Sequence, residues 1–148
     1  MADSAYYHLE RMLPELDDLK ERGLFSVSEI REIARQRREF EFRLERRSKV
    51  KEDYLKYIDY ESKLEKLRRI RKKALIRQLK ASYSSSSFHS EKPKKQQKWQ
   101  PSLCDRASAM RIMLIYERAV TRFKGDLGLW LQFIQYCRSQ GTRRMQKV

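Results

Sequence analysis

The 148-residue chain contains few residues that break helices, with four glycines and three prolines. Sheets and tight turns depend on such residues, so their scarcity favours long helices. The two cysteines, Cys104 and Cys137, have no Cys or His at metal-ligand spacing. This argues against a zinc module or a disulfide scaffold and predicts reduced thiols in an intracellular protein. No apolar run approaches 18 residues, and none reaches seven within the first 25, so the sequence predicts neither a membrane span nor a signal peptide.

Charged residues are abundant, at 37% of the chain against about 25% in typical domains. The 35 basic and 20 acidic residues give a net charge of +15. Such a chain is expected near polyanions, either a nucleic acid or an acidic protein. The charge is uneven along the sequence: residues 1–22 carry 3 basic and 6 acidic side chains, whereas residues 23–80 carry 19 basic and 10 acidic.

Apolar residues at helical spacing predict two helices in the first 50 residues. The first is interrupted by Pro14, which kinks or restarts it, and is closed by Gly23. Its stripe consists of Leu9, Met12, Leu13, Leu16 and Leu19. The second begins at a capping box of Ser26 and Glu29 and extends to about residue 48. Its expected buried face, interrupted by Arg37, consists of Val27, Ile30, Ile33, Ala34, Phe40 and Leu44.

The remaining chain divides into three expected segments. Residues 51–80 continue the helical pattern, as one long helix or two stacked ones, through Tyr54, Tyr57, Ile58, Leu64, Leu67, Ile70, Ala74 and Leu75. Residues 81–102 are rich in Ser and Lys and are expected to be a flexible insertion. Residues 103–148 predict two further helices, the second capped by Asp126 and closed by Gly141. The apolar positions of these two helices are Ile112, Ile115, Tyr116, Ala119, Val120 and Phe123, then Leu127, Trp130, Leu131, Ile134 and Cys137. No following helix covers the last stripe, so the array is expected to be truncated.

Two aromatic-rich segments resemble each other. They read Tyr54-Leu-Lys-Tyr57-Ile58-Asp-Tyr60-Glu61 and Trp130-Leu-Gln-Phe133-Ile134-Gln-Tyr136-Cys137, with Tyr116-Glu117-Arg118-Ala119-Val120 between them. Together they resemble half-a-TPR (HAT) repeats, which pair an aromatic-rich helix with a second helix ending Y-E-R-A. The pattern departs at Tyr54, where Trp is usual, and at Cys137, where Glu is usual. The resemblance implies that these side chains pack helices together in a solenoid.

The residues before the first repeat resemble the start of the U3 small nucleolar RNA-associated protein 6 family. The similar stretches are Leu13-Pro14-Glu15-Leu16, residues 23–30 (GLFSVSEI), Arg46-Arg47 and Lys51-Glu52-Asp53-Tyr54. Within that family the resemblance implies a nucleolar subunit of the UtpB subcomplex of the small-subunit processome, needed for early cleavage of pre-18S ribosomal RNA. The implied partners are WD-repeat propeller subunits, the U3 small nucleolar ribonucleoprotein (snoRNP) and the precursor-rRNA particle.

Three features permit more than one interpretation. The aromatic rings are either helix core or an RNA-stacking platform, although such platforms need exposed rings. The densest basic run is a solvated face, a phosphate contact or a nuclear-import signal; it comprises Arg68, Arg69, Arg71, Lys72 and Lys73. A second basic group, Lys92, Lys94 and Lys95, is either an import signal or plain linker. Glu61 and Glu117 lie within helix-packing motifs, where structural hydrogen bonding competes with acid/base catalysis.

The sequence therefore predicts an all-α protein in which N-terminal helices lead into the start of a HAT or TPR-like solenoid. The expected function is that of a non-enzymatic scaffold in ribosome assembly, without a cofactor. The alternatives are a module that binds RNA directly and a HAT-repeat scaffold of splicing or 3′-end processing.

Overall fold

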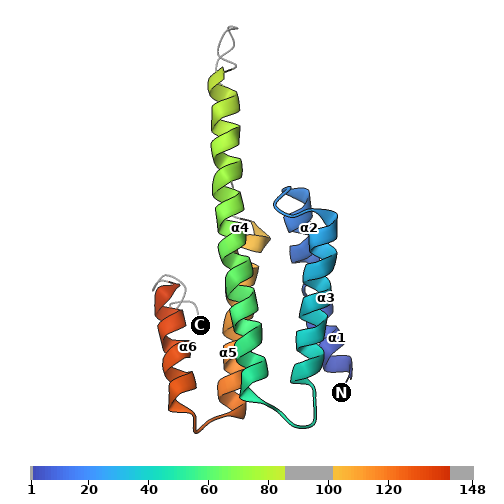
Figure 1. Ribbon diagram of the computed structural model, residues 1–148, viewed down its shortest axis with the longest axis vertical. Helices are drawn as coiled ribbons and strands as arrows, with labels where there is room; N and C mark the ends of the chain where they lie inside the picture. The colour runs from blue at the N-terminus through green and yellow to red at the C-terminus, as the bar shows by residue number, and fades with distance from the viewer. Residues whose placement is uncertain (1, 86–101, 141–148) are drawn as a thin grey trace.

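The computed structural model describes residues 2–85 and 102–140, and every regular element within them is a helix (Figure 1). The elements are α1 (Ala2–Glu10), α2 (Leu13–Glu21), α3 (Val27–Leu44), α4 (Lys51–Ser85), α5 (Leu103–Arg122) and α6 (Leu127–Ser139). The all-helical class expected from the sequence is thus confirmed for the described part of the chain. None of these helices is both long and apolar enough to cross a lipid bilayer.

The first two helices are separated at Pro14, as the sequence predicts. Pro14 is the second residue of α2, a position where its missing N–H has no helical acceptor to lose. Gly23, with φ of +65°, ends α2. The Gly23 N–H donates to the Lys20 carbonyl at 2.9 Å and the Leu24 N–H to the Leu19 carbonyl at 3.1 Å, which is the Schellman pattern. The positive φ explains why a glycine is favoured there.

The predicted capping box at the start of α3 is confirmed. The Ser26 N–H donates to the Glu29 carboxylate at 2.8 Å, and the Glu29 N–H donates to the Ser26 hydroxyl at 3.2 Å. Two orphan backbone donors at the helix start are thereby satisfied. α3 ends at Leu44, about four residues before the expected end.

The pattern that begins at residue 51 forms one helix, α4, of 35 residues. It runs through residues 81–85, which belong to the expected insertion, while residues 86–101, including Lys92, Lys94 and Lys95, lie outside the described residues. α5 then begins after Ser102, whose N–H donates to the Asp105 carboxylate at 3.1 Å.

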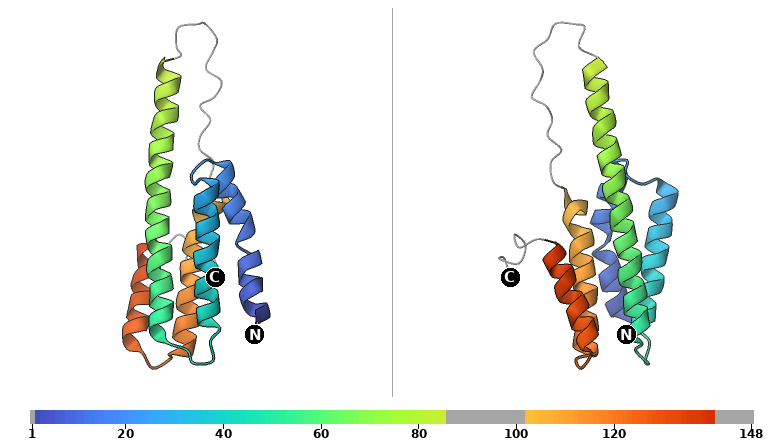
Figure 2. Two further views of the ribbon diagram at one scale, coloured as in Figure 1. Left: turned by 45° about the vertical axis from the view of Figure 1, so that its right-hand side comes forward. Right: turned by 60° about the vertical axis from the view of Figure 1, so that its left-hand side comes forward.

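Successive long helices alternate in direction (Figures 1 and 2). α4 packs against α3 and, more extensively, against α5. α1 and α2 pack on α3, α2 also reaches α5, and α6 packs on α5. One apolar cluster joins α4, α5 and α6 to the end of α3: Leu44, Tyr54, Tyr57, Ile58, Ile112, Ile115, Tyr116, Ala119, Val120 and Leu129. A second joins α2 and α3 to the start of α5: Leu16, Leu19, Leu24, Phe25, Ile33 and Cys104.

The last third of α4 projects beyond the other helices (Figures 1 and 2). In the middle of α4, some apolar side chains expected to be buried are exposed as well, including Leu67 and Ile70, the latter 64% exposed. Leu13 and Val27 are also exposed, so the expected apolar faces of α2 and α3 were partly wrong. In each case the side chain has the right helical spacing but no neighbouring element to pack against.

Candidate functional site

The aromatic residues of the first repeat-like segment lie inside the helix bundle. Tyr54 and Tyr57 of α4 are buried, and Tyr60 is half-buried. The Tyr57 ring stacks on Phe40 of α3 with centroids 4.8 Å apart, and the Tyr54 ring meets Phe123, the residue that follows α5, edge-on at 5.9 Å. The rings of Tyr54 and Tyr57 are therefore enclosed by other side chains, and RNA-stacking platforms need exposed rings.

The residues of the Tyr116 segment join α5 to α3, α4 and α6. Tyr116 is buried and stacks on Phe133 of α6 at 5.5 Å, with Tyr136 also at 5.6 Å. Ala119 is completely buried, and its small side chain permits close approach of α4 and α5. Arg118 is partly exposed and donates to Glu41 of α3 at 2.9 Å, whereas Glu117 is exposed.

Most of the apolar stripe expected on α6 points away from the bundle. Leu127 is 76% and Leu131 is 66% exposed, and Ile134 and Trp130 are exposed as well. The buried contacts are made instead by Leu129, which the sequence pattern missed, and by Cys137. The sequence pattern offered no following helix to cover this stripe, and among the described residues it forms an apolar surface on the outer side of α6.

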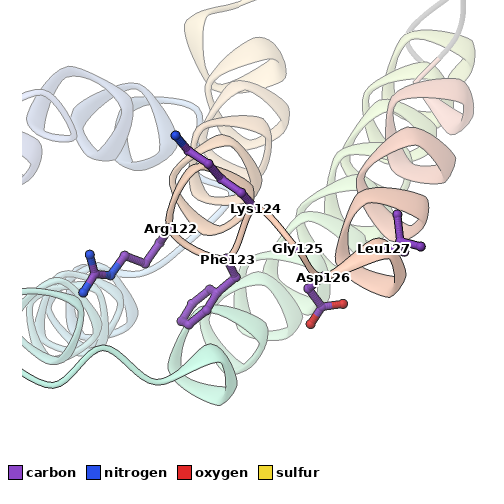
Figure 3. Close-up of a pocket in the computed structure, with 6 residues that line it drawn as sticks. All are labelled: Arg122, Phe123, Lys124, Gly125, Asp126 and Leu127. Carbon is purple, nitrogen blue, oxygen red and sulfur yellow. The ribbon is translucent and has the colours of Figure 1, made fainter.

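Figure 3 shows the turn between α5 and α6. Polar contacts fix this turn. Asp126 accepts from the Leu129 N–H at 3.0 Å, as its predicted capping role requires, and forms an ion pair with Lys51 of α4 at 2.6 Å. The Trp130 indole N–H donates to the Lys124 carbonyl at 3.1 Å. The turn borders an open hollow of about 670 Å³ that residues 122–127 line. Side chains in Figure 3 point in different directions around this turn and do not converge on a common centre.

A buried network of charged side chains lies where α2, α3, α4 and α5 meet. At its centre is Arg37 of α3, which has no exposed side-chain surface. Its guanidinium donates to Glu61 of α4 at 2.7 and 3.0 Å and to Glu15 of α2 at 3.2 and 3.4 Å. Arg111 of α5 donates to Glu15 at 2.5 Å and approaches Glu61 at 3.8 Å. Two cations and two carboxylates thus balance one another in the interior.

This network corrects the expectation that Arg37 interrupts the buried face of α3. Arg37 lies four residues after Ile33, and Glu15 lies three after Met12, so each occupies a position that helical spacing assigns to the interior. Charged residues are almost never fully buried unless they are paired. The signal was thus present as a charge within each apolar stripe, but no sequence pattern identifies partners 22 to 96 residues apart.

The pKa values agree with this pairing. Burial raises the pKa of Glu15, whereas the charges and hydrogen bonds of Arg37 and Arg111 lower it. The lowering is the larger effect, so the pKa of Glu15 lies below its ordinary value. Burial opposes the charge of Arg37, yet Glu61 and Glu15 hold its pKa above the ordinary value. Tyr57 has a raised pKa, chiefly through burial, and its hydroxyl has no hydrogen-bond partner among the described residues. The pairing therefore favours the ionised forms of Glu15 and Arg37.

Several cations of the predicted basic run are bound within the chain. Arg68 is buried and contacts Glu65 at 2.7 Å and Asp105 at 2.6 Å, and Lys72 contacts Asp105 at 2.7 Å. These bonds fasten α4 to the start of α5. Two of the five cations of the basic run are thereby neutralised within the chain.

Arg71 is also used internally. It donates to the Glu29 carboxylate at 2.7 and 2.9 Å and to the Leu24 carbonyl at 3.0 Å, and it lies 4.6 Å from the centre of the Phe25 ring. Arg69 and Lys73, the other two residues of the run, face solvent. The run is therefore divided between an inward and an outward side of α4.

The carboxylates considered for acid/base chemistry have different surroundings. Glu61 is enclosed by the network around Arg37, and Glu117 is exposed on α5. Among residues 2–85 and 102–140, no group of three or more His, Cys, Asp or Glu side chains is arranged to hold a metal ion. The distinctive features of the described structure are thus helix seams, an outward apolar face and an outward basic face.

Comparison with known proteins gives a consistent result. The sequence model of the family described as U3 small nucleolar RNA-associated protein 6 matches residues 9–98. The chain is 35% identical over 136 residues to U3 small nucleolar RNA-associated protein 6 of Schizosaccharomyces pombe, covering 92% of this chain and 24% of that protein. It is 29% identical over 150 residues to the Homo sapiens homolog, covering 100% of this chain and 22% of that protein. The Mus musculus homolog is 30% identical over 146 residues, with 97% and 21% covered. The chain thus spans about a quarter of the length of these relatives or slightly less.

Proposed function

The chain belongs to the U3 small nucleolar RNA-associated protein 6 family, and we propose that it is a non-enzymatic scaffold in the nucleolar small-subunit processome. In this role it acts in processing of pre-18S ribosomal RNA and so in assembly of the small ribosomal subunit. Its proposed partners are WD-repeat propeller subunits of the UtpB subcomplex, the U3 snoRNP and the precursor-rRNA particle. The names of the relatives support the association with U3 RNA.

The observation that carries the scaffold proposal is the arrangement of α4, α5 and α6. These helices run alternately up and down and join through ring pairs at both seams, Tyr54 with Phe123 and Tyr116 with Phe133. Helical-repeat proteins stack helix pairs in this way and present extended surfaces to partners. We propose that α4 and α5 form the first HAT repeat and that α6 begins the second.

The outer face of α6 supports this interpretation. Its exposed apolar side chains form a continuous surface: Leu127, Trp130, Leu131 and Ile134. Large apolar surfaces on soluble proteins mark interaction sites. In a solenoid, such a face receives the next helix or a partner subunit, because each repeat buries its apolar surface only by stacking on a neighbour.

The charged groups of the interior support a structural role as well. Glu61 has its carboxylate directed at Arg37, which leaves it poorly placed to exchange protons with a substrate. Replacing Glu61 or Glu117 by Gln is expected to leave ribosomal-RNA cleavage intact in cells where the variant accumulates normally. If the Glu117→Gln protein is folded and abundant but ribosomal-RNA cleavage is lost, Glu117 would instead act in acid/base catalysis.

Purification of the tagged chain from nucleolar extracts tests the proposal. U3 RNA and pre-18S rRNA are measured in the purified fraction against the spliceosomal U1 RNA. We expect selective recovery of U3 RNA with propeller subunits. Equal recovery of U1 RNA and splicing factors would favour the splicing alternative and contradict the proposed particle.

A matched pair of variants tests whether the outer face of α6 contributes. Leu131→Glu places a charge on that face, and Leu13→Glu places the same charge on a 57% exposed position of α2. Both side chains are exposed, so neither change is expected to lower the melting temperature by more than a few degrees. We expect Leu131→Glu to reduce recovery of the protein partners and Leu13→Glu to leave it unchanged. Equal recovery with both variants would show that α6 does not carry the interaction.

A further inference from the structure

The outward side of α4 carries a stripe of cations that differs from the basic run read from the sequence. Counting along the helix, exposed basic residues recur at intervals of three, four, four and three residues. We call these residues the α4 basic stripe: Lys66, Arg69, Lys73, Arg77 and Lys80. At 100° per residue they fall within an arc of about 80°, so they share one face over roughly 21 Å of helix.

The cations of α4 that face the other helices are paired with carboxylates, whereas most of those that face solvent have no such partner among the described residues. The inward cations Arg68, Arg71 and Lys72 are neutralised by carboxylates of α3, α4 and α5. Of the stripe residues, Arg69 donates through Nε to Glu65 and remains 54% exposed. The other four form no ion pair with any described residue. The sequence between Glu65 and Glu91 contains no Asp or Glu, so no carboxylate on the helix interrupts the stripe.

The shape of this face determines what can occupy it. The last third of α4 projects beyond the other helices (Figures 1 and 2), and no stripe residue lines the hollow of about 330 Å³ between α4 and the turn before α3. Protein partners are usually anchored by apolar or aromatic side chains in pockets, and the stripe offers one exposed apolar side chain nearby, Ile70. A chain of phosphates needs no pocket, because cations at regular intervals bind it by charge.

We propose that the α4 basic stripe binds the phosphate backbone of RNA. The proposal adds a direct RNA contact to the proposed function, on which it rests only for the RNA-rich setting. Cations one helical turn apart, about 5.4 Å, alternate with phosphates along a strand without reading bases. The deep groove of an RNA duplex does not admit a helix, so α4 lies across the backbone and the contact is independent of sequence.

The test uses the full 148-residue chain and a fluorescently labelled 30-nucleotide RNA. Affinity is measured by fluorescence anisotropy over a range of salt concentrations. Five phosphate contacts with a single strand predict a slope of log K against log salt of about −3.5. The stripe variant Lys66→Gln, Lys73→Gln and Arg77→Gln removes three of them and is expected to reduce the slope by about 2 and to weaken binding at least about tenfold at 150 mM salt.

A second variant controls for net charge. Arg31, Arg38 and Lys124 are exposed cations of α3 and the α5–α6 turn, and changing all three to Gln alters the net charge by the same amount. We expect this variant to bind RNA as the unchanged chain does. Equal weakening in both variants, or no binding by the unchanged chain at 150 mM salt, would overturn the proposal. Helical content and melting temperature of both variants are measured to establish that they are folded.

Competition distinguishes RNA from an acidic protein. Polyglutamate at equal charge concentration is expected to displace RNA poorly. If it displaces RNA as well as unlabelled RNA does, the stripe is a site for acidic proteins and the RNA proposal is wrong. This test and the test of the scaffold proposal can fail independently. If the tagged chain does not recover U3 RNA but the purified chain binds RNA through the stripe, only the scaffold role is refuted. If U3 RNA is recovered but the stripe variant binds RNA as well as the unchanged chain does, only the RNA-binding role of the stripe is refuted.

Discussion

Replacing Arg37 by Met is expected to destabilise the protein more than most single substitutions. The change removes the guanidinium that donates to Glu15 and Glu61, while the Met side chain fills much of the same space. Glu61 then keeps only the 3.8 Å approach of Arg111, although its carboxylate stays buried. Removing one partner of a buried ion pair costs about 3–5 kcal/mol, because the other charge stays in the interior without compensation. This loss is a large part of the free energy of unfolding, which is about 5–15 kcal/mol for a typical domain.

The assay is urea unfolding followed by circular dichroism at 222 nm. If the free energy of unfolding falls by about 2 kcal/mol per molar urea, the expected loss lowers the urea concentration at the midpoint of unfolding by about 2 M. The double variant Arg37→Met and Glu61→Met removes one cation and one anion and retains the Glu15–Arg111 pair at 2.5 Å. It is expected to recover most of the loss, since apolar replacements of buried ion pairs are often neutral or stabilising. A loss below about 1 kcal/mol in the single variant, or a double variant no more stable than the single, would refute this reasoning.

Three further predictions concern local structure and pH. Gly23→Ala has free space for a methyl group but must adopt φ of +65°, so it should cost about 1 kcal/mol in urea unfolding; an unchanged midpoint would contradict the strained-turn account. Ser26→Ala removes the side-chain acceptor of the α3 capping box and should cost about 0.5–2 kcal/mol, whereas Ser48→Ala, at an exposed position outside the helices, serves as its control. For Asp18, burial raises the pKa but hydrogen bonds, first that from the Cys104 N–H, lower it to about 2, and the hydrogen bond from Arg71 lowers the pKa of Glu29 to about 2. Because both pKa values are below those of the unfolded chain, near 4, stability should be complete above about pH 5 and fall as pH decreases toward 2; a urea midpoint constant from pH 5 to pH 3 would exclude this contribution.

The positions of the helices and the residues that cap them could be predicted from the sequence. Periodicity located the helical segments, and Ser26, Gly23 and Asp126 marked starts and stops correctly because capping chemistry depends on residues within one helical turn. The pattern left open whether residues 51–80 form one helix or two, since a helical stripe has the same spacing in both cases. The structure shows a single α4.

The side chains of the candidate surfaces were less predictable. A helical stripe shows which residues share a face, but burial depends on whether another element lies opposite. Leu131 and Ile70 have the spacing of core residues and are exposed because nothing in the described structure covers them. Arg68 and Lys73 look alike in the sequence, yet one is buried against Asp105 and the other faces solvent. That division depends on where α5 begins against α4, a long-range relation that local spacing does not contain.

The contacts of α2 with α5 affect how the protein opens. The Cys104 N–H donates to Asp18 at 2.9 Å across 86 residues of sequence, and Arg111 reaches Glu15 across 96. In a simple repeat array each helix touches only its neighbours, so unfolding can start at either end and spread. Here the N-terminal helices are fastened to the middle of the chain, and separating them breaks bonds of α2, α3, α4 and α5 together. The segment from α2 to α5 is therefore expected to open as one cooperative unit, whereas α6, which packs chiefly on α5, can separate without breaking these bonds.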